Sequence, residues 1–188
     1  HSRRDPTRTT TYGTGQLIAA AMQRSARDIL VGIGGSATCD GGCGAAQAMG
    51  VRFFDRQNHL IETPITGGML GDITRIEIGE PIRRLRVACD VTNPLTGPDG
   101  AAVVYGPQTG ATPAQVRMLD QNLRHLAAMI RTHLRTDVEQ LPGGGAAGGL
   151  GAGMVAFLGS ELRPGIDLVL DAVRFDERVR DCDLCLTG

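Results

Sequence analysis

The sequence predicts an α/β fold, a mixed sheet flanked by helices, and three observations favour this class. Short apolar runs at residues 28–33, 51–55 and 85–91 have the length and composition of strands. Longer segments at residues 14–27 and 113–136 carry the residue types that favour helices. Glycine-dense turns follow the first and third of the strand candidates. Strands and helices that alternate in this way are typical of α/β proteins.

Composition narrows the class of partner. The chain has 188 residues, 41% of them hydrophobic, which is enough for one substantial domain. Nineteen basic and twenty acidic residues leave a formal net charge of −1, so we expect neither nucleic acid nor an anionic membrane as a partner. No apolar run approaches the roughly 20 residues of a membrane helix. We therefore expect a cytoplasmic protein that binds small molecules.

All of the basic residues are arginines, and this excludes some chemistry within the chain. The chain has no lysine. A P-loop of the GxxxxGK[ST] type and covalent catalysis by a lysine are therefore both excluded. The aromatic content of 3% also argues against a surface on which nucleic-acid bases stack.

The first half of the chain predicts two helices and three strands. A helix is expected over residues 14–27, and a buried strand follows at residues 28–33. A second helix is expected over residues 42–49, while residues 66–78 combine helix and strand signals. The apolar face of the first helix is formed by four residues spaced as on one side of a helix: Leu17, Ile18, Ala21 and Met22.

The clearest element is a long helix that starts at Pro113. Thr112 is placed as its N-cap, and Gln115 completes a capping box. His125 and His133 lie near the apolar stripe and are interpreted as packing residues. The stripe itself repeats at spacings of three and four: Val116, Leu119, Leu123, Leu126, Ile130 and Leu134.

The last third of the chain is glycine-dense and then helical. Residues 142–153 read PGGGAAGGLGAG and are expected to open a helix into MVAFLG. Residues 165–181 are expected to be helical in two pieces, and the final run DLCLTG, residues 183–188, is expected to form a strand.

The loop after the first strand, IGGSATCDGGCG at residues 33–44, predicts a binding site. Five glycines in one connection allow backbone N–H groups to approach a ligand closely. The loop also lies between a strand end and a helix N-terminus, where backbone amides bind anions. Gly34, Gly35, Ser36 and Thr38 are therefore candidate phosphate- or substrate-binding residues.

Acids and amides follow the strand candidates as well. Asp40 and Asp90 are the candidate catalytic residues, as metal-positioning groups or bases, and Asn93 and Gln108 supply polar contacts. These are the parts of a phosphoryl-transfer site, which needs amides for phosphate oxygens and a carboxylate for Mg²⁺ or for the acceptor hydroxyl. The same residues also occur in ordinary turns, so composition leaves both readings open. A dinucleotide fingerprint fits less well, because the run GIGGSA lacks the third glycine of GxGxxG.

The five cysteines favour reduced thiols. A zinc site could be drawn from Cys39, Cys43, Cys182 and Cys185, but an extended chain would turn the second pair to opposite sides. We therefore interpret the cysteines as small residues without a metal, and the metal ligands of the site stay unknown from the sequence.

Several long motifs resemble the bacterial glycerate kinase family, type I. They are TTTYGTGQLIAAA, VGIGGSATCDGGCGAAQAMGVRF, VACDVTNPLTGPDGAAVVYGPQTGATPAQ, GGGAAGGLGAGMVAFLGSELRPGIDLVLD and DLCLTG. The resemblance implies a glycerate 2-kinase, which phosphorylates D-glycerate with ATP and Mg²⁺, giving 2-phosphoglycerate. It also implies small-molecule partners, a possible homo-oligomer, and two α/β domains, one of them flavodoxin-like and interrupted by the other.

The resemblance further implies that residues 1–188 form the central part of such an enzyme. They are expected to be mostly the inserted α/β domain with short pieces of the flavodoxin-like one, whose two ends lie outside, and to be inactive alone. Arg8 or Arg163 is expected to hold the substrate carboxylate. The sequence departs from the family at Cys39, where asparagine is usual, and at Thr109, where lysine is usual. A non-catalytic module that binds a small anion or a nucleotide is the alternative.

Overall fold

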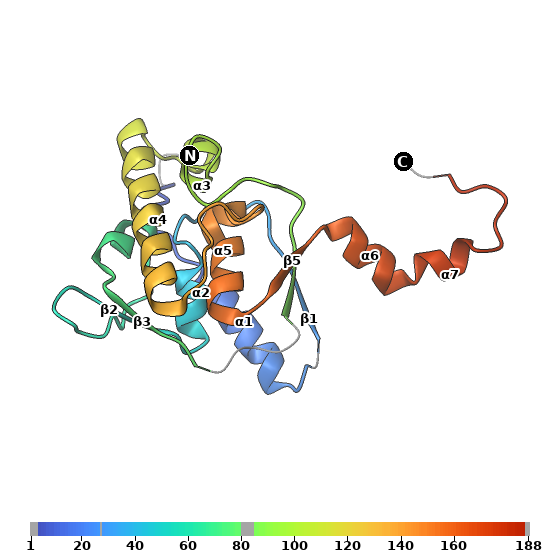
Figure 1. The fold of residues 1–188 in the computed structure, drawn as a ribbon, viewed down its shortest axis with the longest axis horizontal. Coiled ribbons are helices and arrows are strands. Elements are labelled where there is room, and N and C mark those ends of the chain that lie inside the picture. The colour runs from blue at the N-terminus through green and yellow to red at the C-terminus, as the bar shows by residue number, and fades with distance from the viewer. Residues whose placement is uncertain (1–3, 27, 80–84, 187–188) are drawn as a thin grey trace.

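A parallel sheet of three short strands lies at one side of the fold, beside the helices (Figure 1). The computed structural model describes residues 4–26, 28–79 and 85–186. Strand β4 (Leu85–Ala88) lies at the centre and pairs with β1 (Ile29–Gly32) and β5 (Glu161–Arg163). The register places Ile29 opposite Leu85, and Arg86 opposite Glu161. The α/β class expected from the sequence is confirmed.

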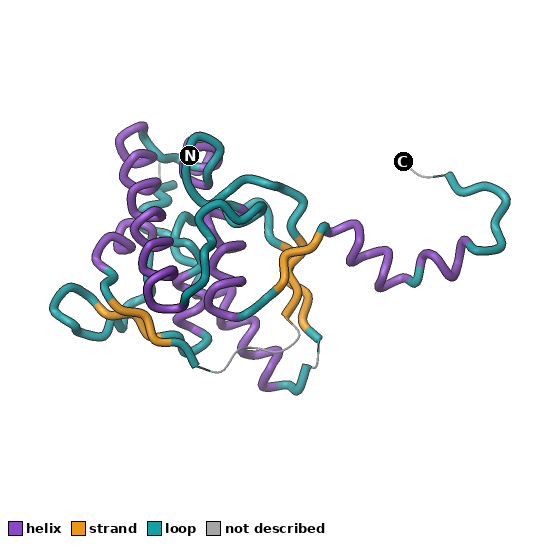
Figure 2. Tube along the Cα trace, in the orientation of Figure 1, coloured by secondary structure: helices purple, strands orange, loops and turns teal. Residues whose placement is uncertain are grey.

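A second, smaller sheet lies apart from the first (Figure 2). It pairs β2 (Arg52–Phe54) with β3 (Arg75–Glu77) in antiparallel fashion. The 3₁₀ helix η1 (Gly67–Asp72) precedes β3, so the mixed signals of residues 66–78 correspond to a helical turn followed by a strand. The two sheets are separate because β2 and β3 pair with each other rather than with β1, β4 or β5, and β3 packs beside helix α4.

Helix α4 (Pro113–Leu134) is the longest element, and its expected capping box is confirmed. The hydroxyl of Thr112 accepts the N–H of Gln115, and the Gln115 side chain accepts the N–H of Thr112. His125 is half-buried and packs as expected, whereas His133 is exposed, so the packing prediction is wrong for His133. Nε2 of each lies beside a backbone carbonyl, of Ile73 and Thr74 respectively. Four members of the predicted stripe are fully buried: Leu119, Leu123, Leu126 and Ile130.

Helix α1 (Tyr12–Gln23) corrects the sequence prediction at both ends and on its buried face. It starts two residues before the expected helix and ends four residues earlier. Of the predicted apolar face, Ile18 is buried, whereas Leu17 is 75% exposed and Met22 40% exposed. The reason is that α1 packs against α2 (Cys43–Ala48) through Gly15, which lies against the Ala45 backbone, so residues 15 and 18 define the inner face.

Helix α5 (Ala146–Leu158) packs on the sheet and begins irregularly. Its first turn contains Ala147, Gly148 and Gly149 in left-handed conformations, with φ of 52°, 70° and 92°. A Cβ at Gly148 would overlap the carbonyl oxygen of Thr38, so glycine is required there for the close approach of the two backbones. The regular part of the helix is almost entirely buried.

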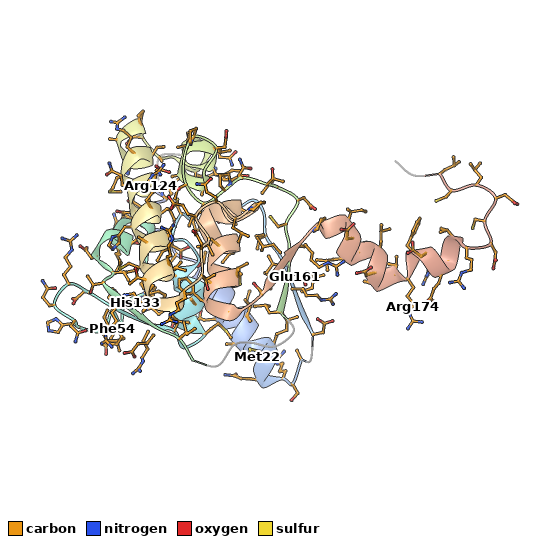
Figure 3. The ribbon with its side chains drawn as sticks, viewed as in Figure 1. Met22, Phe54, Arg124, His133, Glu161 and Arg174 are labelled. Atoms are coloured by element: carbon orange, nitrogen blue, oxygen red, sulfur yellow. The ribbon has the colours of Figure 1, made fainter. Side chains whose placement is uncertain are left out.

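The remaining helices are α3 (Ala101–Tyr105), the 3₁₀ helix η2 (Pro107–Thr109), α6 (Gly165–Val173) and α7 (Phe175–Val179). Helices α6 and α7 form an arm that projects from the sheet, with Arg174 at their junction (Figures 1 and 3). The strand expected over residues 183–188 is wrong for residues 183–186, which are irregular and exposed because no neighbouring strand pairs with them. Residues 187–188 lie outside the described residues.

Candidate functional site

The candidate site lies where the carboxyl ends of β1 and β4 meet the first turn of α5. The glycine loop leaves β1 at Ile33 and turns at Gly35, whose φ is +62°. The Ser36 and Thr38 hydroxyls lie 2.5 Å apart, and the Thr38 N–H donates to the Ser36 hydroxyl at 3.1 Å. Ligands of open α/β sheets bind at this edge. The loop borders two adjoining cavities.

The first cavity, the tyrosine cavity, has a volume of about 140 Å³. It brings together four of the predicted site residues from two separate segments of the chain, Gly34, Gly35 and Ser36 from one and Gln108 from the other. The other lining residues come from the end of β1, from the loop after β4, from α3 and from the start of α5: Ile33, Val91, Tyr105, Ala146, Ala147 and Gly148.

The second cavity, the hydroxyl cavity, has a volume of about 210 Å³ and holds the predicted residue Thr38. Ile33, Gly34, Ser36 and Ala147 line both cavities and form the wall between them. No charged side chain from the part of the chain that the structure describes lines the hydroxyl cavity, and five of its lining side chains carry a hydroxyl group: Thr10, Thr11, Thr14, Ser36 and Thr38. Apolar groups and backbone complete it: Val31, Gly32, Ile33, Gly34, Ala147 and Leu150.

Asp40 lies beneath the site and is completely buried. Its Oδ2 accepts the N–H of Thr11 at 2.7 Å, the Thr11 hydroxyl at 2.8 Å and the N–H of Gly44 at 3.2 Å. Its Oδ1 accepts the N–H of Gly42 at 3.1 Å. Burial raises the pKa of Asp40, and these four hydrogen bonds oppose the rise. The carboxylate therefore joins the start of α1 to the start of α2.

Asp90 differs from Asp40 in that it is exposed, two residues after the end of β4. Its Oδ1 accepts the N–H of Gly165 at 2.7 Å, at the beginning of α6. Among the described residues, neither Asp90 nor Asp40 lines the tyrosine cavity or the hydroxyl cavity. The structure thus places the two carboxylates in different environments, one inside the fold and one at the surface of the sheet edge.

Asn93 lies behind the tyrosine cavity. Its Oδ1 accepts the hydroxyl of Tyr105 at 2.8 Å, and its Nδ2 donates to the carbonyl of Asp99 at 2.9 Å. Its own carbonyl accepts the N–H of Gly145 at 2.9 Å. Asn93 therefore connects the loop after β4, helix α3 and the glycine-dense segment before α5.

The two arginines considered for a substrate carboxylate lie on different segments. Arg8 is exposed in the loop before α1. Arg163, at the end of β5, pairs with Asp171 at 3.0 Å and lines a separate cavity of about 400 Å³ beneath the arm. Thr109, which stands where the family usually has lysine, is buried and donates its hydroxyl to the carbonyl of Gly106 at 2.8 Å.

The cysteines lie in two environments. Cys39 and Cys43 are buried, whereas Cys182 and Cys185 are exposed on the chain beyond α7. Burial, with the nearby Asp40 charge as the second cause, raises the pKa of Cys39 to about 12 and also raises that of Cys43. Within residues 4–26, 28–79 and 85–186, no group of three or more His, Cys, Asp or Glu side chains is arranged to hold a metal ion. No helix in the same ranges is both long and apolar enough to cross a bilayer.

Sequence reasoning missed four polar lining residues: Thr10, Thr11, Thr14 and Tyr105. Thr10 and Thr11 lie just before α1 and Thr14 lies in its first turn, and only the fold brings this segment to the end of β1. The signal that could have found Tyr105 was its place in the run YGPQTGA beside Gln108, which was singled out.

The parallel sheet, the glycine loop and the two cavities define an α/β protein that gathers backbone groups and hydroxyls at the carboxyl edge of its strands. The model of the "Glycerate kinase family" matches residues 1–188, so the chain belongs to the glycerate kinase family.

Individual relatives agree with this assignment. The chain is 50% identical over 191 aligned residues to a glycerate kinase of Halalkalibacterium halodurans, covering 99% of this chain and 50% of the relative. It is 47% identical over 191 residues to the glycerate 2-kinase of Escherichia coli, with the same coverage of 99% and 50%. A crystal structure from Salmonella typhimurium LT2, described as a glycerate kinase 2, superposes with a TM-score of 0.90 at 46% identity and covers 97% of this chain and 50% of that one. The chain thus spans about half the length of the relatives that it matches.

Proposed function

We propose that the chain takes part in the ATP-dependent phosphorylation of D-glycerate, and that the product is 2-phosphoglycerate. Membership of the glycerate kinase family supports the reaction class. The observation that carries the proposal is the pair of adjoining cavities, which share the wall formed by Ile33, Gly34, Ser36 and Ala147. Phosphoryl transfer needs a donor and an acceptor side by side, and two cavities with a common wall provide such an arrangement.

The hydroxyl cavity suits the acceptor. Glycerate is a small hydroxy acid, and the side-chain hydroxyls of Thr10, Thr14 and Thr38 can both donate to and accept from its hydroxyl groups. In this proposal, the backbone N–H groups of the glycine loop bind phosphate oxygens at the shared wall. We keep Arg8 and Arg163 as candidates for the substrate carboxylate; Arg163 would have to leave Asp171 to serve in this way.

Asp90 is the residue that fits a magnesium ion. Mg²⁺ in kinases is bound by one or two carboxylates together with substrate phosphates, and it neutralises charge on the transferring group. Asp90 is exposed at the sheet edge, and only its Oδ1 accepts a hydrogen bond from the described residues, so Oδ2 is available as a ligand. Asp40 does not fit, because both of its oxygens accept internal hydrogen bonds and the side chain has no exposed surface. We propose that Asp40 positions Thr11 and the glycine loop instead.

The experiment compares Asp90→Asn with the unchanged protein, both as the full-length polypeptide that the gene encodes. A coupled assay follows glycerate-dependent ADP formation, and ³¹P NMR distinguishes 2- from 3-phosphoglycerate. Loss of a metal ligand or a base should lower kcat by about a hundredfold or more. Asp167→Asn is the matched control, because Asp167 is an exposed acid in the first turn of α6, the helix whose first N–H donates to Asp90.

An Asp90→Asn enzyme with unchanged kcat would remove Asp90 from the mechanism. Binding of ADP or glycerate by the unchanged protein without any product would favour the alternative of a non-catalytic binding module. We further propose that the 188-residue chain alone does not turn over. A site that lacks part of its cleft would lose much of the roughly 7–11 kcal/mol that positioning contributes.

A further inference from the structure

The tyrosine cavity is closed on one side by Tyr105, whose hydroxyl has a defined partner. The phenolic oxygen lies 2.8 Å from Oδ1 of Asn93, and the amide nitrogen of Asn93 lies 2.9 Å from the carbonyl of Asp99. A carbonyl can only accept a hydrogen bond, so the Asn93 amide must present its NH₂ group to Asp99 and its oxygen to Tyr105. Tyr105 therefore donates its single proton to Asn93.

The protonation state of Tyr105 agrees with this assignment. Burial raises the pKa of the Tyr105 phenol, and the charge of a Cys89 thiolate would raise it further. The phenol thus remains the neutral donor that the Asn93 oxygen requires. Because the Tyr105 hydroxyl donates its proton to Asn93, it can only accept a hydrogen bond from a ligand and cannot donate one to a phosphate or carboxylate oxygen.

The same asparagine holds three walls of the tyrosine cavity together. Its side chain binds α3 through Tyr105, and its backbone carbonyl binds the segment before α5 through the N–H of Gly145. Asn93 itself follows Val91, which lines the cavity from the loop after β4. We call the set of hydrogen bonds among Tyr105, Asn93, Asp99 and Gly145 the asparagine tether.

We infer that Tyr105 is a positioning residue, which sets the shape of the tyrosine cavity through the asparagine tether. Its ring forms part of the cavity wall, and the hydrogen bond to Asn93 fixes where that wall stands relative to Gly34 and Ala147. The inference deepens the proposed function and rests on it for the identity of the reaction. Asn93, which the sequence suggested as a ligand contact, acts here through its neighbours.

The test is a double-mutant cycle in the full-length protein. Tyr105→Phe keeps the ring and removes only the hydroxyl, while Asn93→Ala removes the partner. Tyr105→Phe should raise the KM of one substrate, ATP or D-glycerate, by about two- to tenfold, the effect of one hydrogen bond, and change kcat by less than about twofold. The substrate affected is the one that occupies the tyrosine cavity. Tyr12→Phe is the control, because Tyr12 is the only other tyrosine of the 188 residues and lines neither cavity.

The cycle separates a tether from two independent contacts. In the Asn93→Ala background, Tyr105→Phe should have no further effect on KM, because the hydrogen bond is already lost. Multiplicative effects on KM, or an unchanged KM in Tyr105→Phe, would overturn the inference.

The same variants also test the inference when no reaction can be measured. If the unchanged protein shows no glycerate-dependent turnover, the proposed function fails, and the cycle is measured in thermal unfolding instead. A melting temperature for the double variant equal to that of Asn93→Ala supports the tether, and additive shifts refute it. If Asn93→Ala fails to fold, Tyr105→Phe is compared with Tyr12→Phe instead. A change in KM or in melting temperature for Tyr105→Phe that Tyr12→Phe does not show supports the inference, and equal values overturn it.

Discussion

Asp40 shows how burial can change the meaning of an acidic residue that the sequence places in a binding loop. A carboxylate among glycines suggests catalysis, yet four donors and zero exposure make Asp40 a connection between α1 and α2. We expect Asp40→Asn to lower the free energy of unfolding by about 1–3 kcal/mol, because the amide nitrogen would face a backbone donor. Chemical denaturation monitored by circular dichroism measures this change.

The effect of Asp40 on stability should depend on pH. Because the pKa of Asp40 is raised in the folded state, the folded protein holds the proton more tightly than the unfolded chain above the ordinary carboxyl value of 3.8. Stability should therefore fall as the pH rises from 3.8 through the folded pKa, and Asp40→Asn should remove that part of the slope. If the loss of unfolding free energy caused by Asp40→Asn instead increased with rising pH, the raised pKa of Asp40 would be contradicted.

At the scale of elements, the sequence predicted what local pattern determines and missed what packing decides. The capping box and the apolar stripe of α4 are local signals, and both are present in the structure. The buried face of α1 is set instead by Gly15 against α2, which no periodicity in α1 encodes. In the candidate site, the glycine loop carries its own signal, but no local pattern marks Thr10, Thr11 and Thr14, at the start of α1, as its neighbours.

The packing of α4 gives a direct test at this scale. Leu123→Ala should lower the free energy of unfolding by about 2–5 kcal/mol, because Leu123 is fully buried and its loss leaves a cavity. Gln121→Ala on the exposed side of the same helix should change stability little. Equal melting temperatures for the Leu123→Ala and Gln121→Ala proteins would show that the stripe does not pack inward.

At the scale of the molecule, the arm formed by α6 and α7 differs from the rest. It projects from the sheet and holds one buried residue, Leu168, whereas Ile166, Val169 and Val173 are 61%, 54% and 41% exposed (Figure 1). Segments with few buried contacts open locally at low cost in free energy. The sequence predicted the two helices of the arm, but how little of them is buried follows only from their place outside the core.

Limited digestion of the 188-residue chain with trypsin should reveal this difference. Cleavage is expected first at Arg174, Arg178 or Arg180 of the arm, because a protease needs a locally unfolded segment. The comparison is with Arg124 and Arg131, whose side chains are 48% and 50% exposed but belong to the firmly packed helix α4. Mass spectrometry identifies the first products, and early cleavage within α4 would contradict the assignment.

The contact between Gly148 and the carbonyl of Thr38 has a mechanical consequence. Because backbone meets backbone there, no side chain can change rotamer to absorb a displacement, and the N–H of Gly41 also donates to the carbonyl of Gly148 at 3.1 Å. The glycine loop and the first turn of α5 must then shift as one stiff unit. Both segments border both cavities. A displacement of this unit at the shared wall therefore changes the volumes of both cavities at once.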